Sequence, residues 1–159
     1  MTVFQEAEML RQVPLFEKVD LTRLKLIAFT SRAMRYAAGD VVMQKNEVSD
    51  CAFVILEGEV EVVGETAEGE FVVARFGRNS LVGEMSLLLD APRVATVRAT
   101  TPVRALRIAG DQFLRLLCEN PSCSLHVMRV LSSRLTRATR RVEELTGKLQ
   151  EAGNGDAVT

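Results

Sequence analysis

The sequence predicts an α+β domain that is mainly β: an antiparallel β jelly-roll barrel flanked by N-terminal helices and a long C-terminal helix. Three observations support this fold class. Short β-branched runs separated by turn residues fill the stretch from about 36 to 109. Apolar residues recur at helical spacing before that stretch, and a heptad pattern of apolar residues follows it. Many short strands at such spacing are typical of a small antiparallel barrel or jelly roll.

Residues 4–36 are predicted to be helical. Asp20 is a suitable N-cap for a helix in which Leu21 and Leu24 begin an apolar face. Pro14 separates this helix from a shorter one before it.

The predicted strands are the apolar, β-branched runs 41–43, 52–56, 60–63, 71–73, 96–99 and 103–108. Residues rich in turn formation (Gly, Asn and Asp) lie between them. One segment breaks the β pattern, because residues 84–89 read as about one turn of helix between two strands.

The end of the chain predicts a long helix over about 121–150, with Pro121 in its first turn. Its apolar residues follow one another by alternating steps of three and four: Met128, Leu131, Leu135, Ala138, Val142, Leu145 and Leu149. Such an a/d seam is typical of helix-to-helix pairing, so we expect a homodimer. Packing of this helix against its own barrel is the alternative. Residues 151–159, which include two glycines, are expected to form a disordered tail.

Composition limits the classes of function. The chain has 159 residues with 20 Lys+Arg and 21 Asp+Glu, a net charge of −1 that gives no general attraction to nucleic acid or to an anionic membrane. The start of the chain lacks the basic region of a signal peptide, and no apolar run approaches the roughly 20 residues of a membrane span. Three cysteines without C-x-x-C spacing favour reduced thiols. We therefore expect a cytoplasmic protein.

The segment from 83 to 97 carries the most chemical information. A short helix after Gly83 directs its free backbone N–H groups at one point, which favours an anion. The guanidinium of Arg93 could hold two phosphate oxygens, and Glu84 could accept hydrogen bonds from a neutral hydroxyl pair such as a ribose. Phosphate and ribose in one apolar cradle indicate a nucleotide with one negative charge.

This segment resembles the phosphate-binding cassette of the cyclic nucleotide-binding domain family, which includes regulatory subunits of cAMP-dependent protein kinase and the catabolite activator protein. The family pattern is G-E with small and apolar residues, then P-R-x-A-T/S-V. The chain has G-E-M-S-L-L at 83–88 and P-R-V-A-T-V at 92–97. The resemblance extends over about 14–140 and includes P-L-F at 14–16, A-G-D at 38–40, F-V-I-L-E-G at 53–58 and N-P at 120–121. It implies one cyclic nucleotide-binding domain over 1–150.

The resemblance also implies the site. Arg93 would bind the cyclic phosphate and Glu84 the ribose 2′-hydroxyl. The remaining ligand-binding residues it implies in the cassette are Gly83, Met85, Ser86, Val94 and Ala95. Members that prefer cGMP often carry threonine where this chain has Val94, which favours cAMP, with cGMP as the alternative. Alignment with catabolite activator protein places Thr139 where that protein contacts adenine from the partner subunit; a solvent-facing hydroxyl is the simpler interpretation.

The chain departs from the family at three positions. Two turns that usually hold glycine hold Asn46 and Asn79, and we expect both asparagines to adopt positive φ. Val82 replaces an aromatic residue before Gly83.

Two regulatory functions remain. The first is a stand-alone cAMP sensor that transmits binding through its C-terminal helix, with a hinge near 120–121, to a protein partner or a second copy. The alternative is the dimerisation module of a transcription regulator lacking its DNA-binding domain, or a domain for another effector. Only about ten residues follow Leu149, too few for a helix-turn-helix, so no direct DNA binding is expected.

An enzyme is the third class of function that the fold allows. Cupin-like barrels also house metal-dependent oxygenases, which need several inward-facing histidines, whereas this chain has only His126. Motifs for a nucleophile, a zinc site or nucleoside triphosphate hydrolysis are missing from the sequence. We therefore expect no enzyme, no metal and no cofactor other than the nucleotide ligand.

Overall fold

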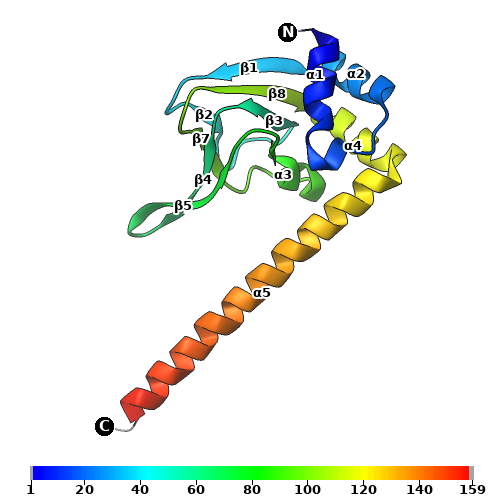
Figure 1. The fold of residues 1–159 in the computed structure, drawn as a ribbon. Helices are drawn as coiled ribbons and strands as arrows, with labels where there is room; N and C mark the ends of the chain where they lie inside the picture. The colour runs from blue at the N-terminus through cyan, green and yellow to red at the C-terminus, as the bar shows by residue number, and fades with distance from the viewer. Residues whose placement is uncertain (1, 158–159) are drawn as a thin grey trace. The chain divides into compact units, whose positions relative to one another are not determined.

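The computed structural model describes residues 2–157 (Figure 1). It divides into two units: the first ends at Cys123 and the second begins at Ser124. The helices are α1 (Val3–Arg11), a 3-10 turn η1 (Pro14–Phe16), α2 (Leu21–Thr30), α3 (Glu84–Leu89), α4 (Gly110–Glu119) and α5 (Pro121–Ala157).

Eight strands make up the β part of the first unit. They are β1 (Arg32–Tyr36), β2 (Val41–Met43), β3 (Cys51–Glu57), β4 (Val60–Thr66), β5 (Gly69–Phe76), β6 (Leu81–Val82), β7 (Thr96–Ala99) and β8 (Val103–Ala109). Each run predicted as a strand coincides with a strand or lies within one. In Figure 1 helices α1, α2 and α4 gather at one end of β1 and β8.

The strands form two four-stranded antiparallel sheets, ordered β1-β8-β3-β6 and β2-β7-β4-β5. The prediction of a barrel is therefore wrong in its closure. Within the described residues no ladder joins the edge strands of one sheet to those of the other. A barrel needs two hydrogen-bonded neighbours for every strand. Strands β2 and β6 have only three and two residues, too short to extend the ladders around a closed sheet. Alternating side chains occur in both arrangements, so the sequence pattern could not separate them.

Both sheets bury side chains in one core. The buried cluster draws on β2, β3, β4, β6, β7 and β8 and includes Met43, Cys51, Phe53 and Val97. Tyr36 packs against it with its ring edge-on to Phe53, the ring centroids 6.4 Å apart. The candidate site begins at the Cys51 end of this core.

The N-terminal prediction needs one correction, because residues 32–36 form strand β1 and are not helical. Ala33 and Met34 favour helix locally, but all five residues of this strand pair with β8. Tertiary pairing therefore overrides local propensity here. The other expectations for this region are confirmed, since Asp20 caps α2 and accepts a hydrogen bond from the Arg23 backbone N–H at 2.9 Å.

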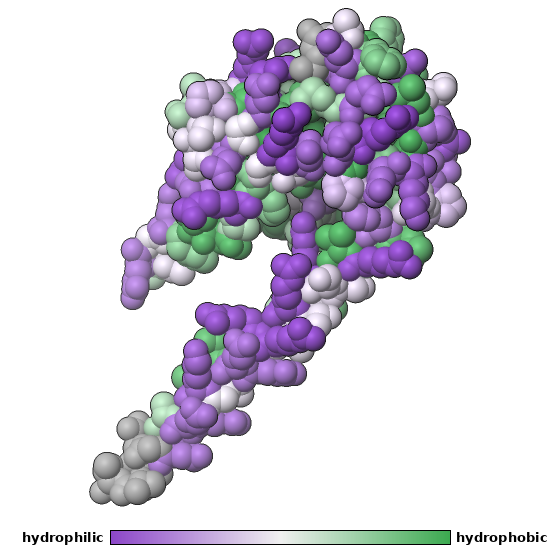
Figure 2. All heavy atoms as spheres, viewed as in Figure 1, coloured by the Kyte–Doolittle hydropathy of each residue, from purple (hydrophilic) through white to green (hydrophobic). Residues whose placement is uncertain are grey.

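Helix α5 starts at Pro121, as predicted, and continues to Ala157. Residues 151–157 are therefore helical and do not form the predicted tail, and 158–159 lie outside the described residues. The glycines here cost only about 1 kcal/mol each relative to alanine, and no proline stops the helix. Figure 2 shows hydrophilic residues over most of the visible surface of α5, with hydrophobic spots between them. None of the helices in the described part combines the length and the hydropathy needed to span a bilayer.

Candidate functional site

Gly83 is the N-cap of α3 and sets the geometry of the site. Its backbone is left-handed, with φ 86° and ψ 4°. A Cβ at this position would lie 2.7 Å from Arg93 Nη1 and 2.9 Å from Met43 Cε. Only glycine combines this backbone conformation with such a close approach of a guanidinium. The start of α3 and the side chain of Arg93 therefore pack in close contact.

The backbone of Arg93 is fixed by the loop between β2 and β3. The Arg93 N–H donates to Glu47 O, and the Asn46 N–H donates to Arg93 O, both at 2.9 Å. Asn46 has φ 73° and Asn79 has φ 68°, so the expectation of positive φ at both asparagines is confirmed. These two bonds, one donated and one accepted by Arg93, pair its backbone with residues 46 and 47.

The side chain of Arg93 is 4% exposed. Its Nη1 donates to Gly83 O at 2.8 Å, and its Nη2 donates to Cys51 O at 2.6 Å and to Cys51 Sγ at 3.3 Å. All three acceptors are neutral. No acidic side chain in the described part of the chain pairs with this guanidinium. A buried cation without a counter-ion carries a desolvation cost of several kcal/mol, which an anion would offset.

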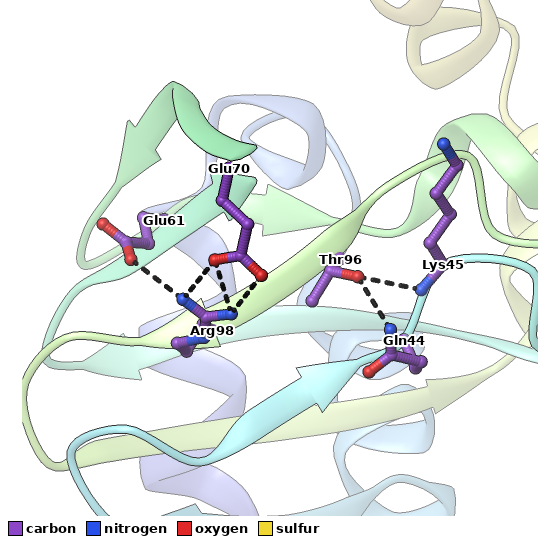
Figure 3. A network of polar contacts seen from close by, with 6 residues as sticks. All are labelled: Gln44, Lys45, Glu61, Glu70, Thr96 and Arg98. Carbon is purple, nitrogen blue, oxygen red and sulfur yellow. Dashed lines mark hydrogen bonds and ion pairs between the residues drawn. The ribbon is translucent and has the colours of Figure 1, made fainter. Parts of the chain in front are cut away.

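Downstream of Arg93, the chain enters β7 through two polar contacts drawn in Figure 3. The hydroxyl Oγ1 of Thr96 accepts from Gln44 Nε2 and from the Lys45 backbone N–H, each at 3.1 Å. Two residues on, Arg98 forms ion pairs with Glu61 at 3.8 Å and Glu70 at 3.2 Å. These contacts tie β7 to its neighbours, so the segment that carries Arg93 is anchored at both ends.

Cys51 is the first residue of β3 and is buried. Burial raises the pKa of its thiol above the ordinary value of 9.0, although the nearby Arg107 and Arg93 act in the opposite direction. The sulfur next to Arg93 is therefore a neutral thiol at physiological pH. Burial likewise raises the pKa of Tyr36, which packs against the same core.

Seven of the eight predicted site residues lie in the first unit, in or next to α3 and in the loop that leads to β7: Gly83, Glu84, Met85, Ser86, Arg93, Val94 and Ala95. Ser86 is buried, whereas Met85 and Val94 are exposed. Among these seven residues, Gly83 and Arg93 are in direct contact. Thr139 belongs to α5 in the second unit, is exposed, and its hydroxyl donates to Leu135 O at 2.9 Å. Thr139 therefore stays a prediction.

Sequence reasoning missed two contributors, Cys51 and the carbonyl of Glu47. The cysteine spacing predicts only a reduced thiol at Cys51. Its strand is buried at six consecutive positions, so it lacks the alternation that would show which side chains face the site. A backbone carbonyl leaves no signal in a sequence at all.

A hollow of about 610 Å³ lies elsewhere on the first unit, lined by Phe4, Gln5, Glu8, Met9, Arg35 and Arg104. None of the predicted site residues lines it. Within the described residues, no group of three or more His, Cys, Asp or Glu side chains could hold a metal ion. The three cysteines are free thiols.

Comparison with known proteins agrees with this geometry. The family model for the cyclic nucleotide-binding domain matches residues 33–120. This range contains both sheets apart from the first residue of β1, and it includes the whole cassette. The chain belongs to the cyclic nucleotide-binding domain family.

The relatives are regulators. The chain is 34% identical over 113 residues to a cAMP-dependent protein kinase regulatory subunit of Mycosarcoma maydis, covering 68% of this chain and 22% of that protein. It is 24% identical over 139 residues to the CRP-like cAMP-activated global transcriptional regulator of Mycobacterium tuberculosis, covering 87% and 62%. The sensor domain of the transcriptional regulator DNR from Pseudomonas aeruginosa shares the fold, with a TM-score of 0.76, 24% identity and coverage of 84% and 90%.

The chain thus spans about a quarter of the length of the kinase regulatory subunits it matches and 62% of the mycobacterial regulator. Those relatives are a kinase regulatory subunit and a transcriptional regulator, and the chain shares the cyclic nucleotide-binding domain family with them.

Proposed function

We propose that this chain is a sensor domain that binds a cyclic nucleotide, cAMP in preference to cGMP, at residues 83–95. The observation that carries the proposal is Arg93, a buried guanidinium whose protein partners are all neutral. A cyclic phosphodiester has one negative charge, which matches the single uncompensated positive charge. The similarity to cAMP-dependent regulators supports the same ligand class.

The residues of the cassette bind different parts of the nucleotide. Three of the five N–H donors of Arg93 are engaged by Gly83 and Cys51, which leaves two for phosphate oxygens. Glu84, in the first turn of α3, is the acceptor for the ribose 2′-hydroxyl. The Arg93 contact joins opposite charges, whereas the Glu84 contact joins a carboxylate to a neutral hydroxyl, so Arg93 supplies most of the affinity. Val94 offers no hydroxyl to a guanine amino group, which favours adenine.

Calorimetric titration with cAMP and cGMP tests this assignment. Arg93→Ala should weaken cAMP binding by at least roughly 100-fold, since it removes the buried guanidinium proposed to bind the phosphate, at a cost of about 3–5 kcal/mol. Glu84→Gln should weaken it less, because the amide oxygen still accepts a hydrogen bond. The matched control is Arg11→Ala, an exposed arginine of α1 paired only with Glu8 on its own helix. Binding by Arg93→Ala as tight as by the wild type would refute the site.

We further propose that α5 pairs with α5 of a second copy and carries the output. Four apolar residues at intervals of seven, Met128, Leu135, Val142 and Leu149, are between 62% and 74% exposed. Seven-residue spacing keeps one face of a helix apolar along its length, as helix pairing requires. At the base of this helix, Arg23 Nη1 donates to Asn120 Oδ1 at 2.7 Å, which ties the proposed hinge to α2.

Sedimentation tests the pairing. Leu135→Glu should convert a dimer to a monomer, whereas Ser133→Glu, an exposed polar position on the same helix, should leave the dimer intact. Wild-type protein that sediments as a monomer at every concentration would contradict the proposal.

The second candidate function is the dimerisation module of a transcription regulator, or a domain for a different effector. It is favoured by the match to the mycobacterial regulator, of which this chain covers 62%. A wild-type dimer that binds neither cAMP nor cGMP in the titration would favour this alternative.

A further inference from the structure

Cys51 lies outside the cassette and contributes its side chain to the surroundings of Arg93. Cys51 contacts the Nη2 group of Arg93 twice, through its carbonyl at 2.6 Å and through its sulfur at 3.3 Å. The carbonyl contact depends only on the backbone. The sulfur contact depends on the residue type, and it engages the second proton of Nη2. Cys51 therefore fixes the plane of the guanidinium as well as its position.

The chemistry of a thiol suits this task. Burial raises the pKa of the Cys51 thiol and keeps the sulfur protonated, and Asp50 acts in the same direction. Arg107 and Arg93 lower this pKa. Tyr36 is a further titratable neighbour. A neutral sulfur is a weak acceptor, so it orients the guanidinium without neutralising it. A carboxylate here would form a buried ion pair with Arg93 and compete with a phosphate. An aliphatic side chain would leave one N–H of Nη2 without a partner.

We propose that Cys51 is a positioning residue for Arg93. The side chain of Cys51 holds the Arg93 guanidinium in the orientation that receives an anionic ligand, and it leaves the positive charge of Arg93 available to that ligand. This inference rests on the proposed function for the affinity it predicts, but the orientation of Arg93 can be measured without a ligand. Cys51 thus connects β3 to the cassette, 42 residues further along the chain.

The ligand-free test is side-chain ¹⁵N NMR of Arg93 in the wild type, Cys51→Ser and Cys51→Val. A guanidinium held at both Nη groups rotates slowly about its C–N bonds and gives separate Nη resonances. The wild type and Cys51→Ser, which keeps a neutral acceptor, should show separate Nη resonances for Arg93. Cys51→Val keeps both carbonyl contacts but loses the sulfur acceptor, so its Nη2 resonance should broaden and its Nη2 protons should exchange with water faster than in the wild type. Unchanged resonances in Cys51→Val would overturn the proposal.

The ligand test is calorimetric titration with cAMP. Relative to the wild type, Cys51→Ser should bind within about threefold, Cys51→Val about fivefold more weakly, and Cys51→Asp at least about 50-fold more weakly. The control is Cys118→Ser, an exposed cysteine on α4. Thermal melting identifies any variant that fails to fold. If Cys51→Asp fails to fold, the affinities of Cys51→Ser and Cys51→Val test the proposal.

A double variant separates positioning from general packing. In an Arg93→Lys background, which has no Nη2 group, Cys51→Val should no longer change the affinity for cAMP. Equal losses in both backgrounds would mean that Cys51 acts only by filling space. If the wild type binds neither nucleotide, the proposed function fails, and the NMR comparison still decides the role of Cys51.

Discussion

Arg93 and Arg98 are five residues apart in one segment, and their surroundings are opposite in kind. Arg98 lies on β7 with its side chain 31% exposed, and two carboxylates, Glu61 and Glu70, face it (Figure 3). Arg93 is 4% exposed and is surrounded by neutral acceptors. The better-solvated arginine has the counter-ions, and the buried one has none.

This difference distinguishes structural charge from functional charge. Pairing an exposed arginine with carboxylates contributes at most about 1 kcal/mol, and its role is to tie strands together. Leaving a buried arginine unpaired lowers the stability of the empty domain, and that cost is recovered when an anion binds. The contrast therefore supports reading Arg93 as a ligand-binding group and Arg98 as a structural one. The predictions that follow test this contrast, beginning with the largest expected effect.

Gly83→Ala should destabilise the protein by about 3–4 kcal/mol, because it combines a left-handed backbone with a clash against the Arg93 guanidinium. The matched control is Gly39→Ala. Gly39 has a similar φ of 91°, but a Cβ there would meet no atom within 4 Å, so its cost should be only about 1–2 kcal/mol. Chemical denaturation measures both values. Equal losses would show that the close approach of Arg93 has no energetic consequence.

Arg93→Ala should abolish stabilisation by ligand. In the wild type, cAMP at about 100 times its dissociation constant should add about 2.7 kcal/mol to the free energy of unfolding. Arg98→Ala should keep this increment, since Arg98 is already neutralised by Glu61 and Glu70. Thermal melts with and without cAMP measure the difference. Loss of the increment in both variants, or in neither, would break the contrast between the two arginines.

Stability should fall at alkaline pH. Burial raises the pKa of Cys51 and Cys123 above 9.0 and that of Tyr36 above 10.0 in the folded protein. The folded state then holds these protons more tightly than the unfolded state, so their contribution is complete below about pH 9 and is lost as the pH rises through the folded-state values. Denaturation at about pH 7 and about pH 10 should show the decline, and Cys51→Ser should reduce it. A Cys51→Ser decline as large as that of the wild type would contradict the assignment to Cys51.

The smallest effect is expected at Glu70. Glu70→Gln should lower the free energy of unfolding by less than about 1 kcal/mol, because the Arg98 and Glu70 side chains are 31% and 50% exposed and water screens the pair. Its affinity for cAMP should equal that of the wild type. A change in affinity of tenfold or more would show that the Arg98 network takes part in binding.

Local features of the fold could be predicted from the sequence. Helix α3 has the predicted bounds of 84 and 89, and Asn46 and Asn79 adopt the predicted positive φ. These features depend on turn chemistry and on a change of period within a few residues. Strand β1 and the division into two sheets depend on pairing between distant segments, such as β1 with β8. The pattern of residues within a single segment cannot predict pairing between distant strands.

The site divides along the same line. The cassette residues are contiguous, so a motif can identify them. The neighbours that give Arg93 its environment, Cys51 and Glu47, come from β3 and from the loop before it. Only the fold brings them within hydrogen-bonding distance of Arg93. The motif therefore predicts the group that we propose meets the ligand, and only the fold shows the groups that contact this guanidinium and its backbone.

The most direct measurement is a crystal structure of the chain grown with excess cAMP. We expect the nucleotide over the first turn of α3, with N–H groups of Arg93 about 3 Å from its phosphate oxygens and Glu84 bonded to the ribose. Arg93 still bound only to Gly83 and Cys51, with the cassette empty or the nucleotide elsewhere, would contradict the account.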